Sequence, residues 1–271
     1  MPAETDYILG THDEEIARLG LQHNAWKARA LDAWKSAGIR AGQTVLDVGS
    51  GPGYASMDLA DLVGPSGCVV AIEKSHRFLA ALEDMRRQRG IRNITPYQAD
   101  LEAGAFPTAA ADGAWCRWVL AFVNNPRDVL AWLSSALRHG GVIVLHEYFD
   151  YATWRAAPRC PEIEEFVTAV MASWRDVGGE PDIGLQAPGW LEQLGCELRV
   201  VRPLIDVVQP GHPSWAWLRA FVEVGRARLV DLGYLSEARA GSIWRAFLQM
   251  EASPGARMIS PGVLEIVAQR A

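Results

Sequence analysis

Hydrophobic positions along the chain change their spacing near residue 43. Before that point, apolar and aromatic side chains recur every three or four residues, which predicts an amphipathic helix over residues 13–37 that ends at Gly38. After it, short apolar runs alternate with stretches of helical spacing. Such alternation is typical of a parallel β-sheet that is covered by helices on both faces. The chain is therefore predicted to be an α/β protein.

Five apolar runs in the first half of the chain predict the strands of this sheet. They lie at residues 44–48, 68–72, 94–98, 113–118 and 142–146. The last run is continuously apolar up to its final histidine, as expected of a strand buried on both faces. Ser75 is predicted to cap the helix after the second strand. Another helix is expected to begin at Asn125–Pro126, carry Leu137 on its inner face and end at Gly140–Gly141.

The alternation is interrupted after residue 150, where helical spacing dominates. The predicted elements are a helix from Pro161 to Gly178, a short helix over 187–194, a strand over 196–208, a helix capped by Ser214, a helix from Ser236 to about residue 250, and a last strand over 263–267. A long and mostly helical stretch thus separates the last two strands.

The most informative local pattern follows the first predicted strand and reads Asp47-Val-Gly49-Ser-Gly51-Pro-Gly53. Glycines at alternate positions let the backbone turn sharply and let a ligand lie against bare main chain. The helix that follows offers unpaired N–H groups to an anionic group. Glu73 ends the second strand, where a carboxylate suits the two hydroxyls of an unmodified ribose. Together these features predict a nucleoside-binding site.

The spacing of the glycines indicates which nucleoside to expect. Dinucleotide-binding loops use G-x-G-x-x-G, whereas this loop has G-x-G-x-G with an acid two residues before the first glycine. Glu73 would also repel the extra phosphate of NADP. The segment resembles the first motif of class I S-adenosylmethionine (SAM) dependent methyltransferases, and the resemblance extends over most of the chain. The chain looks most like the small-molecule enzymes of ubiquinone and menaquinone biosynthesis and their relatives in bacterial secondary metabolism.

The resemblance implies a fold and a domain organisation. The expected fold is a Rossmann-like, seven-stranded and mostly parallel sheet of order 3-2-1-4-5-7-6, with strand 7 antiparallel, helices on both faces and a helical cap. A single methyltransferase domain over residues 1–271 is expected. It would comprise an N-terminal helical segment (1–40), a SAM-binding core (41–150) and cap segments (151–185 and 210–255) around strands 6 and 7.

S-adenosylmethionine is the cofactor that the resemblance implies. The matching positions are the loop residues Asp47, Gly49, Gly51 and Gly53, the ribose-binding Glu73 with Lys74 beside it, Asp100 and Leu101 flanking the adenine, Trp118 behind the methionine end, and Tyr7, which some small-molecule members use to close over the cofactor. Asp47 would order the loop or contact the amino group of the cofactor. Two alternatives stay open: Asp47 could only cap the turn, and a disordered tail explains Tyr7 equally well.

The candidates for acid–base chemistry stand at the end of the fifth strand. Methyl transfer from a sulfonium needs in-line positioning, exclusion of water and, for some acceptors, a base. His146 could be that base near neutral pH, and Glu147 could be if burial raised its pKa. Strand alternation sends their side chains to opposite faces, and both could instead only orient the loop into the cap. His12 and His23 could reach the site from the N-terminal segment, although a hydrogen-bonded helix histidine explains each as well.

Composition restricts the partners and the compartment. The chain has 271 residues and a net charge of −6, which argues mildly against nucleic acid or an anionic membrane as the main partner. Its four cysteines lie far apart, which fits reduced thiols in the cytosol and no zinc site, so no metal is expected. The N-terminus lacks the features of a signal peptide, and no apolar run approaches the roughly 20 residues of a membrane span. A cytoplasmic protein is expected.

The acceptor is expected to be a small, hydrophobic or aromatic molecule. Of the eleven tryptophans, five fall in the predicted cap, namely Trp154, Trp174, Trp215, Trp217 and Trp244. An aromatic pocket over the cofactor would suit a planar acceptor, although helical spacing also explains them as core. The tetrapeptide of DNA base methyltransferases is absent after the fourth strand, and an enclosing cap disfavours folded protein or duplex DNA. The N-terminal helix and cap could also pack in a homodimer.

Two other functions stay open at this point. A protein of the same fold that binds SAM without methyl transfer, as a cyclase or a binding module, would keep the same glycine loop. A nicotinamide oxidoreductase fits less well because of the glycine spacing. The sequence does not distinguish carbon, nitrogen, oxygen and sulfur as the methylated atom.

Overall fold

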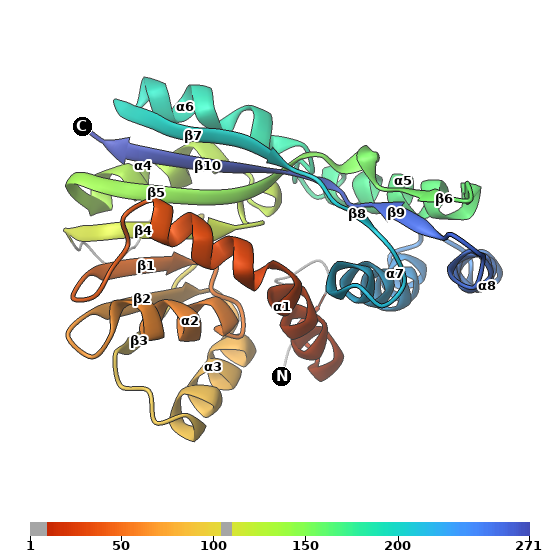
Figure 1. Ribbon diagram of the computed structural model, residues 1–271, viewed down its shortest axis with the longest axis horizontal. Helices are drawn as coiled ribbons and strands as arrows, with labels where there is room; N and C mark the ends of the chain where they lie inside the picture. Colours follow the sequence, from red (N-terminus) through yellow and green to blue (C-terminus); the bar gives the residue numbers. More distant parts are fainter. Residues whose placement is uncertain (1–9, 104–109) are drawn as a thin grey trace.

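The computed structural model describes residues 10–103 and 110–271, and its centre is a twisted sheet with helices around it (Figure 1). The sheet has the strand order β3-β2-β1-β4-β5-β10-β7. Its strands are β1 (Thr44–Val48), β2 (Cys68–Glu73), β3 (Ile94–Gln98), β4 (Ala111–Arg117), β5 (Leu137–Asp150), β7 (Cys196–Leu204) and β10 (Gly262–Arg270). The first five run parallel, and β10 is antiparallel to both of its neighbours. The predicted seven-stranded topology is confirmed.

Helices cover both faces of the sheet because side chains alternate along the buried strands. The flanking helices are α1 (Asp13–Ser36), α2 (Tyr54–Val63), α3 (His76–Gln88), α4 (Pro126–Ala136) and α6 (Ala187–Gln193). In β1, Val45 packs with residues of α1, α2 and α3, whereas Leu46 packs with residues of α4 and α6 on the opposite face. This sandwich places the carboxyl ends of β1 to β5 along one edge.

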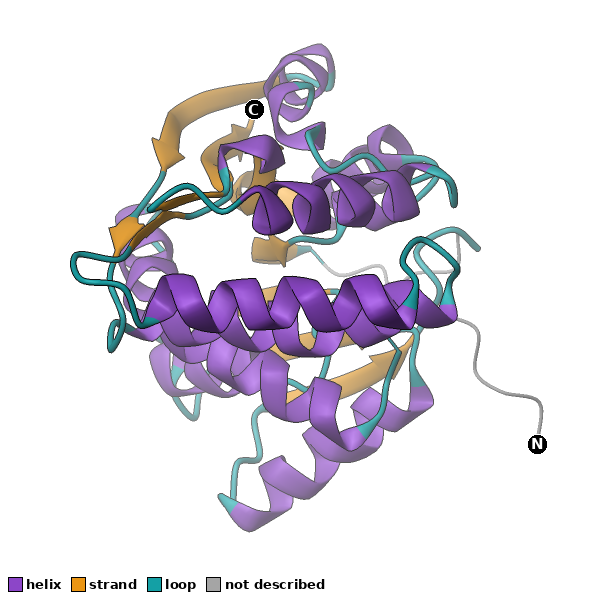
Figure 2. Ribbon diagram, turned by 90° about the vertical axis from the view of Figure 1, so that its right-hand side faces the viewer, coloured by secondary structure: helices purple, strands orange, loops and turns teal. Residues whose placement is uncertain are grey.

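A helical lobe extends from that edge, opposite the start of the parallel strands (Figure 1). It contains α5 (Pro161–Arg175), α7 (Pro213–Asp231) and α8 (Glu237–Glu251), and a small sheet of β6 (Arg155–Ala157), β9 (Arg257–Ile259) and β8 (Val207–Val208). Figure 2, viewed from this end, shows helices of the lobe in front of the strands. Helix α1 packs against α7 and so connects the lobe to the sheet. None of the helices among the described residues is long and apolar enough to cross a membrane.

Two boundaries differ from the sequence-based expectation around the fifth strand. Leu137 is buried, as predicted, but it begins β5 and does not end α4. It pairs with Ala111, and the register between β4 and β5 then shifts before Gly113. Gly140, with φ of +75°, lies in the irregular segment. The two glycines therefore let the strand bulge, which continuous strand pairing requires here, and they do not terminate a helix.

The region after residue 196 also differs from expectation. The single strand predicted over 196–208 divides into β7 and β8, and β8 pairs with β9 in the small sheet, which the sequence patterns did not predict. Asp206 lies at the break, where its N–H bonds to the hydroxyl of Ser260. Ser214 does not cap α7. His212 does, because its Nδ1 accepts the N–H of Ser214, while Pro213 takes the first helical position.

Candidate functional site

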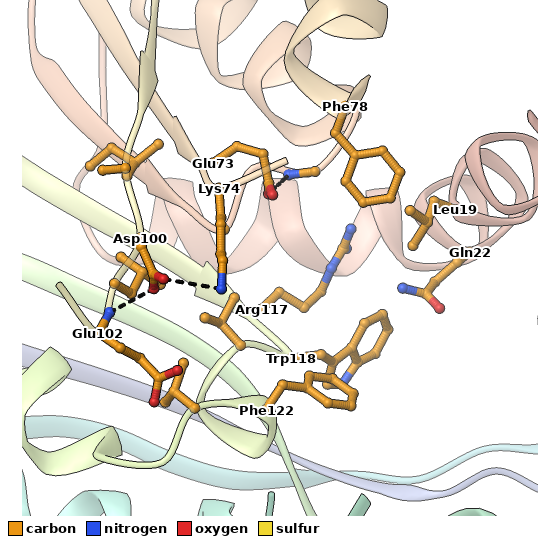
Figure 3. Close-up of a pocket in the computed structure, with 17 residues that line it drawn as sticks. Leu19, Gln22, Glu73, Lys74, Phe78, Asp100, Glu102, Arg117, Trp118 and Phe122 are labelled. Atoms are coloured by element: carbon orange, nitrogen blue, oxygen red, sulfur yellow. Dashed lines mark hydrogen bonds and ion pairs between the residues drawn. The ribbon is translucent and has the colours of Figure 1, made fainter. Parts of the chain in front are cut away.

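A groove lies at the carboxyl ends of β1 to β4, beneath α1 (Figure 3). Its lining consists of Leu19, Gln22, Gly49, Gly51, Ile72, Glu73, Lys74, Phe78, Ala99, Asp100, Leu101, Glu102, Arg117, Trp118, Val119, Phe122 and Val123. An adjoining hollow shares Gly49, Gly51 and Arg117 with it and adds Asp47 and His23. The groove thus gathers most of the cofactor positions that the sequence predicted, although they come from four different strands.

The glycine loop forms the floor of the groove. Gly49, Gly51 and Gly53 have φ of +65°, +55° and +88°, a region that residues with a Cβ rarely adopt. A Cβ on Gly49 would lie 2.3 Å from Cγ2 of Val119, whereas a Cβ on Gly51 would meet nothing within 4 Å. Gly53 does not line the groove: it precedes α2, and a Cβ there would lie 2.5 Å from Leu82. Close approach of two loops thus needs Gly49, and Gly51 leaves space for a ligand.

Two carboxylates stand at the ends of β2 and β3. Glu73 accepts the N–H of Gly51 (2.9 Å) on one oxygen and the N–H of Ser75 (2.8 Å) on the other. Asp100 accepts the N–H of Glu102 (2.9 Å) and forms an ion pair with Nζ of Lys74 (3.0 Å). Burial acts to raise the pKa of Asp100, but these two contacts outweigh it and lower the pKa. Both carboxylates are therefore held in fixed positions beside the groove (Figure 3).

Asp47 lies behind the glycine loop and is 2 % exposed. One of its oxygens accepts the hydroxyl of Ser56 at 2.5 Å. Burial raises the pKa of Asp47 to about 6, against the opposing effects of this hydrogen bond and of the Arg117 charge. A buried carboxylate with one neutral donor is stabilised in its charged form by a cation. An ammonium group bound in the hollow beside Gly49 would be such a cation.

Arg117, a residue with no predicted role in the site, brings a positive charge to the place where the groove and the hollow meet, since it lines both. Its Nη2 donates to Nδ1 of His23 (3.1 Å), and Nε2 of His23 lies 2.8 Å from Asp58. Because arginine can only donate, the proton of His23 is on Nε2. Burial lowers the pKa of His23 and lowers that of Arg117 to about 10, so at pH 7 the guanidinium is charged and the imidazole neutral.

The guanidinium of Arg117 is not fully satisfied by protein atoms. Its buried Nη1 has no hydrogen-bond partner among the described residues. Buried donors in native structures are nearly always paired, and an orphaned cationic donor at a groove favours an anionic ligand. The only sequence signal for this role was its position directly before Trp118 at the end of the fourth strand.

Trp118 follows in a strained backbone conformation, with φ of +53°. Its ring stacks on Tyr148 (centroids 5.1 Å apart) and on Trp217 (5.6 Å), and meets Trp26 edge-on. The packing of three aromatic rings from β5, α7 and α1 holds the residue in this conformation. Trp118 lines the groove, and its place behind the methionine end of the cofactor stays a prediction.

His146 and Glu147 do not line the groove, and both are 0 % exposed. Nε2 of His146 lies 3.1 Å from Glu265, and its ring packs against those of Trp26 and Trp115. Burial lowers the pKa of His146. These contacts are those of a structural histidine, so its position lends no support to the prediction of a general base.

Glu147 points to the other face of the strand. One of its oxygens accepts the N–H groups of Val119 (2.9 Å) and Leu120 (3.1 Å). Burial raises the pKa of Glu147 to about 7, although these hydrogen bonds oppose the rise. The carboxyl group thus holds the loop after β4, whereas the alternative considered above was support of the loop into the cap. Its position, too, lends no support to a catalytic role.

The remaining candidates lie elsewhere. Tyr7 is outside the described residues, and His12 caps α1 by accepting the N–H of Glu15. Four of the five tryptophans of the cap are buried in its core, and Trp244 stacks on Phe247. None of the five lines the groove, whose aromatic side chains are Phe78, Trp118 and Phe122. No group of three or more His, Cys, Asp or Glu among the described residues could hold a metal ion.

The donor set of the groove fits S-adenosylmethionine. A ribose in the groove would meet the carboxylate of Glu73, and an adenine would meet apolar side chains and Asp100. The cation of Arg117 and the anion of Asp47 match the carboxylate and the ammonium of the amino-acid end. The fold and this groove together define a class I, Rossmann-like methyltransferase domain.

Comparison with known proteins identifies the family. Residues 39–177, just over half of the chain, match the model of a methyltransferase domain family, and the chain belongs to that family. S-adenosylmethionine is the cofactor of these enzymes. Among curated relatives, the ubiquinone/menaquinone biosynthesis C-methyltransferase UbiE of Pseudomonas fluorescens is 31% identical over 130 residues, which are 48% of this chain and 50% of the relative. The chain spans about half the length of the curated relatives it matches.

Solved structures show the same fold at low sequence identity. The YcgJ protein of Bacillus subtilis superimposes with a TM-score of 0.60 at 13% identity, over 92% of this chain and 98% of that protein. The [4+2]-cyclase SpnF superimposes with a TM-score of 0.56 at 19% identity, over 90% of this chain and 80% of the cyclase. These two similarities establish the architecture and carry no information on the acceptor.

Proposed function

We propose that this protein transfers the methyl group of S-adenosylmethionine to a small organic acceptor with an apolar or planar body. The observation that carries the proposal is the charge layout of the groove. Two fixed carboxylates, Glu73 and Asp100, line the groove, and the opposed charges of Arg117 and Asp47 line the adjoining hollow. Bound S-adenosylmethionine supplies a methyl group that its positively charged sulfur has already activated.

In this proposal the residues of the chain bind and orient. Glu73 holds the ribose hydroxyls, with Lys74 fixing Asp100 beside the adenine. Arg117 holds the carboxylate of the amino-acid end, and Asp47 holds its ammonium. Fixing both ends of an extended ligand lowers the entropy cost of aligning the reacting atoms. Most of the catalytic effect would therefore come from positioning.

The acceptor is proposed to lie against the aromatic wall of the groove. Trp118, Phe78 and Phe122 provide flat apolar surfaces, and Leu19 of α1 closes the side next to them (Figure 3). Helix α1 and the lobe would limit the size of the acceptor and exclude water from the reacting atoms. We assign His146 and Glu147 to structural support of this region, because neither side chain reaches the groove.

The whole chain is proposed to act as one methyltransferase domain, with the lobe as its cap. The widely spaced cysteines support a reducing, cytoplasmic compartment. The net negative charge supports a small-molecule acceptor and no nucleic-acid partner. A homodimer through α1 and the lobe stays a prediction.

Calorimetric titration with S-adenosylhomocysteine, with NADH as the control, tests the cofactor assignment. Micromolar binding of S-adenosylhomocysteine alone is expected, and binding of NADH alone would favour an oxidoreductase. The second step is an assay for S-adenosylhomocysteine formed from S-adenosylmethionine with a panel of phenolic, amine and thiol acceptors. Cofactor binding without product from any acceptor would favour the alternative of a protein that binds S-adenosylmethionine without transfer. The product assay is needed because a cyclase, SpnF, is among the structures with this fold.

A further inference from the structure

The N-terminal half of α1 buries a row of polar side chains where a helix normally buries apolar ones. Glu15, Arg18 and Gln22, at positions i, i+3 and i+7, are 0 %, 3 % and 9 % exposed. Arg18 and Glu15 form a two-pronged ion pair with contacts of 2.7 and 2.6 Å. The Arg18 guanidinium also lies 5.2 Å from the ring centroid of Phe221 in α7. Buried ion pairs are weak sources of stability, since desolvation offsets most of their attraction.

The row ends at the carboxamide of Gln22, whose oxygen receives two hydrogen bonds. Nη1 of Arg18 donates to it at 2.8 Å, and Nε1 of Trp217 donates at 3.0 Å. Arginine and tryptophan side chains can only donate, so the oxygen of the amide must occupy this position. The NH2 group is therefore forced to the opposite side. The ion pair with Glu15 fixes Arg18, and the packing of α7 fixes Trp217. The two donors therefore determine the orientation of the amide.

The fixed NH2 group faces the groove. Gln22 lines both the groove and the adjoining hollow. Figure 3 shows its amide nitrogen on the groove side, toward Arg117 and Trp118. No hydrogen bond joins this nitrogen to another of the described residues, and it is not sealed from the cavity. A donor that a buried network holds in place, with nothing to donate to, indicates a ligand atom that accepts.

We propose that Nε2 of Gln22 donates a hydrogen bond to an oxygen of the methyl acceptor, which makes the acceptor a small, largely apolar molecule with a phenolic, enolic or carbonyl oxygen. This proposal rests on the proposed function. The Trp217 ring that bonds to the Gln22 amide also stacks on Trp118. The amide therefore lies next to the aromatic wall that is assigned to the acceptor. The amino-acid end of the cofactor already has Arg117 and Asp47. Glu15, Arg18 and Trp217 act as positioning residues for Gln22.

Discrimination against acceptors without the oxygen follows from the geometry. An apolar molecule in the same place would remove water from the NH2 group and offer it no acceptor. Sites built to hydrogen-bond a substrate reject analogues that lack the group far more strongly than apolar pockets reject size differences. The buried polar network thus stabilises the packing of the helix less than apolar side chains would, but it makes the site selective for acceptors that carry an oxygen.

The test uses the protein loaded with S-adenosylhomocysteine and two probes of nearly equal shape, 4-methylacetophenone and 4-isopropenyltoluene, whose affinities are measured by saturation-transfer NMR. The ketone oxygen of the first can only accept a hydrogen bond, so we expect 4-methylacetophenone to bind at least tenfold more tightly than 4-isopropenyltoluene. Gln22→Glu keeps an oxygen for Arg18 and Trp217 but replaces the NH2 with an acceptor. It should fold normally and lose the preference. Gln249→Glu, on the exposed face of α8, is the matched control and should keep it.

Two further variants separate the acceptor site from the other roles of Gln22. Trp217→Phe keeps the stacked ring but loses the N–H, and should reduce the preference without abolishing probe binding. Gln22→Met should change the affinity for S-adenosylhomocysteine less than threefold, and a tenfold loss would assign Gln22 to the cofactor and overturn the proposal. Equal binding of both probes to the wild-type protein, or binding of neither, also overturns it. Failure of S-adenosylhomocysteine to bind the wild-type protein would instead overturn the proposed function.

Discussion

Nη2 of Arg117 lies 3.1 Å from Nδ1 of His23, although 94 residues separate the two in sequence. Arg117 ends β4, and His23 lies in the middle of α1. Asp58 of α2 accepts the N–H of the other imidazole nitrogen, and Nζ of Lys27 donates to the same carboxylate. These contacts hold His23 in place. Helix α1, which covers the groove, thus also fixes the orientation of the Arg117 side chain. Removal of α1 would expose the site and release Arg117.

Arg117→Met is expected to weaken binding of S-adenosylhomocysteine by about 1.5–3 kcal/mol, the usual range for a hydrogen bond to a charged group. Binding of 5′-methylthioadenosine should change little, because that molecule lacks the amino-acid end. Calorimetry with both ligands measures the difference. Arg87→Met, an exposed residue of α3, serves as the control. An equal loss for both ligands would contradict the assignment to the carboxylate.

Glu73→Ala is expected to weaken both ligands equally, by about 1–3 kcal/mol, since each carries the ribose. The loss includes the two backbone N–H groups that Glu73 now holds. Thermal unfolding should show that the variant folds. Glu83→Ala, which removes a half-buried ion pair of α3 away from the groove, is the matched control. Unchanged affinity in a folded Glu73 variant would rule out the ribose assignment.

The affinity for S-adenosylhomocysteine should fall as the pH decreases through about 6. Burial raises the pKa of Asp47 to about 6, so below this pH the carboxyl group is neutral and no longer attracts an ammonium. Well below the pKa the loss approaches about tenfold per pH unit. Binding of 5′-methylthioadenosine, which has no ammonium, should show no such step. Asp47→Asn should remove the step, and its persistence in that variant would assign it to another group.

The ionised side chain of Asp47 is expected to lower the free energy of unfolding at neutral pH. Because the pKa of Asp47 is higher in the folded state than its ordinary value of 3.8, the folded protein binds the proton more tightly, and this contribution to stability is lost as the pH rises from about 4 to 6. A difference of about two pKa units corresponds to about 3 kcal/mol. Asp47→Asn should therefore unfold at a higher temperature than the wild type at pH 7, with little difference at pH 4. A less stable variant at pH 7 would contradict this reasoning.

His146→Ala is expected to cost about 2–4 kcal/mol of stability, because it leaves a cavity between two tryptophans and removes a partner of the buried Glu265. Denaturant unfolding measures the cost. The affinity for S-adenosylhomocysteine in the folded protein should change less than threefold. His139→Ala, at an exposed position, is the control. Wild-type stability together with lost turnover would restore His146 as a catalytic residue.

Gly49→Ala is expected to abolish cofactor binding, because its Cβ would collide with Val119 and its φ is positive. Val119→Ala in the same chain removes the collision but not the backbone strain. The double variant should therefore regain part of the stability and part of the affinity, as unfolding and calorimetry would show. Gly51→Ala, with open space around it, should cost less stability than Gly49→Ala. No recovery in the double variant would place the whole cost in the backbone.

Local patterns predicted the α/β class of the fold and part of the groove. Strand, glycine loop and helix follow one another within a few residues, and parallel strands bring their carboxyl ends to one edge. Glu73 could therefore be placed beside Gly49 from sequence order alone. The family resemblance supplied the position of Asp100, the strand order and the antiparallel last strand. The small sheet of β6, β8 and β9 was missed because its strands of two and three residues carry too little periodicity.

The other half of the groove depends on contacts that no short segment contains. His146 and Glu147 looked like candidate bases because of their place at a strand end, but burial on opposite faces gave each a structural partner. Arg117 looked like an ordinary strand end, yet His23 aims it into the site. Gln22 has no sequence signal of its own, because only the packing of α1 on α7 buries it and fixes its amide.

The sequence by itself thus determined the class of fold, the glycine loop and the carboxylates that follow β2 and β3, because these features depend on backbone conformation and strand order. The tertiary structure alone decided which polar side chains face the groove and in which charge state. Those properties depend on burial and on partners from distant segments, and both are absent until α1 and the lobe close over the edge of the sheet.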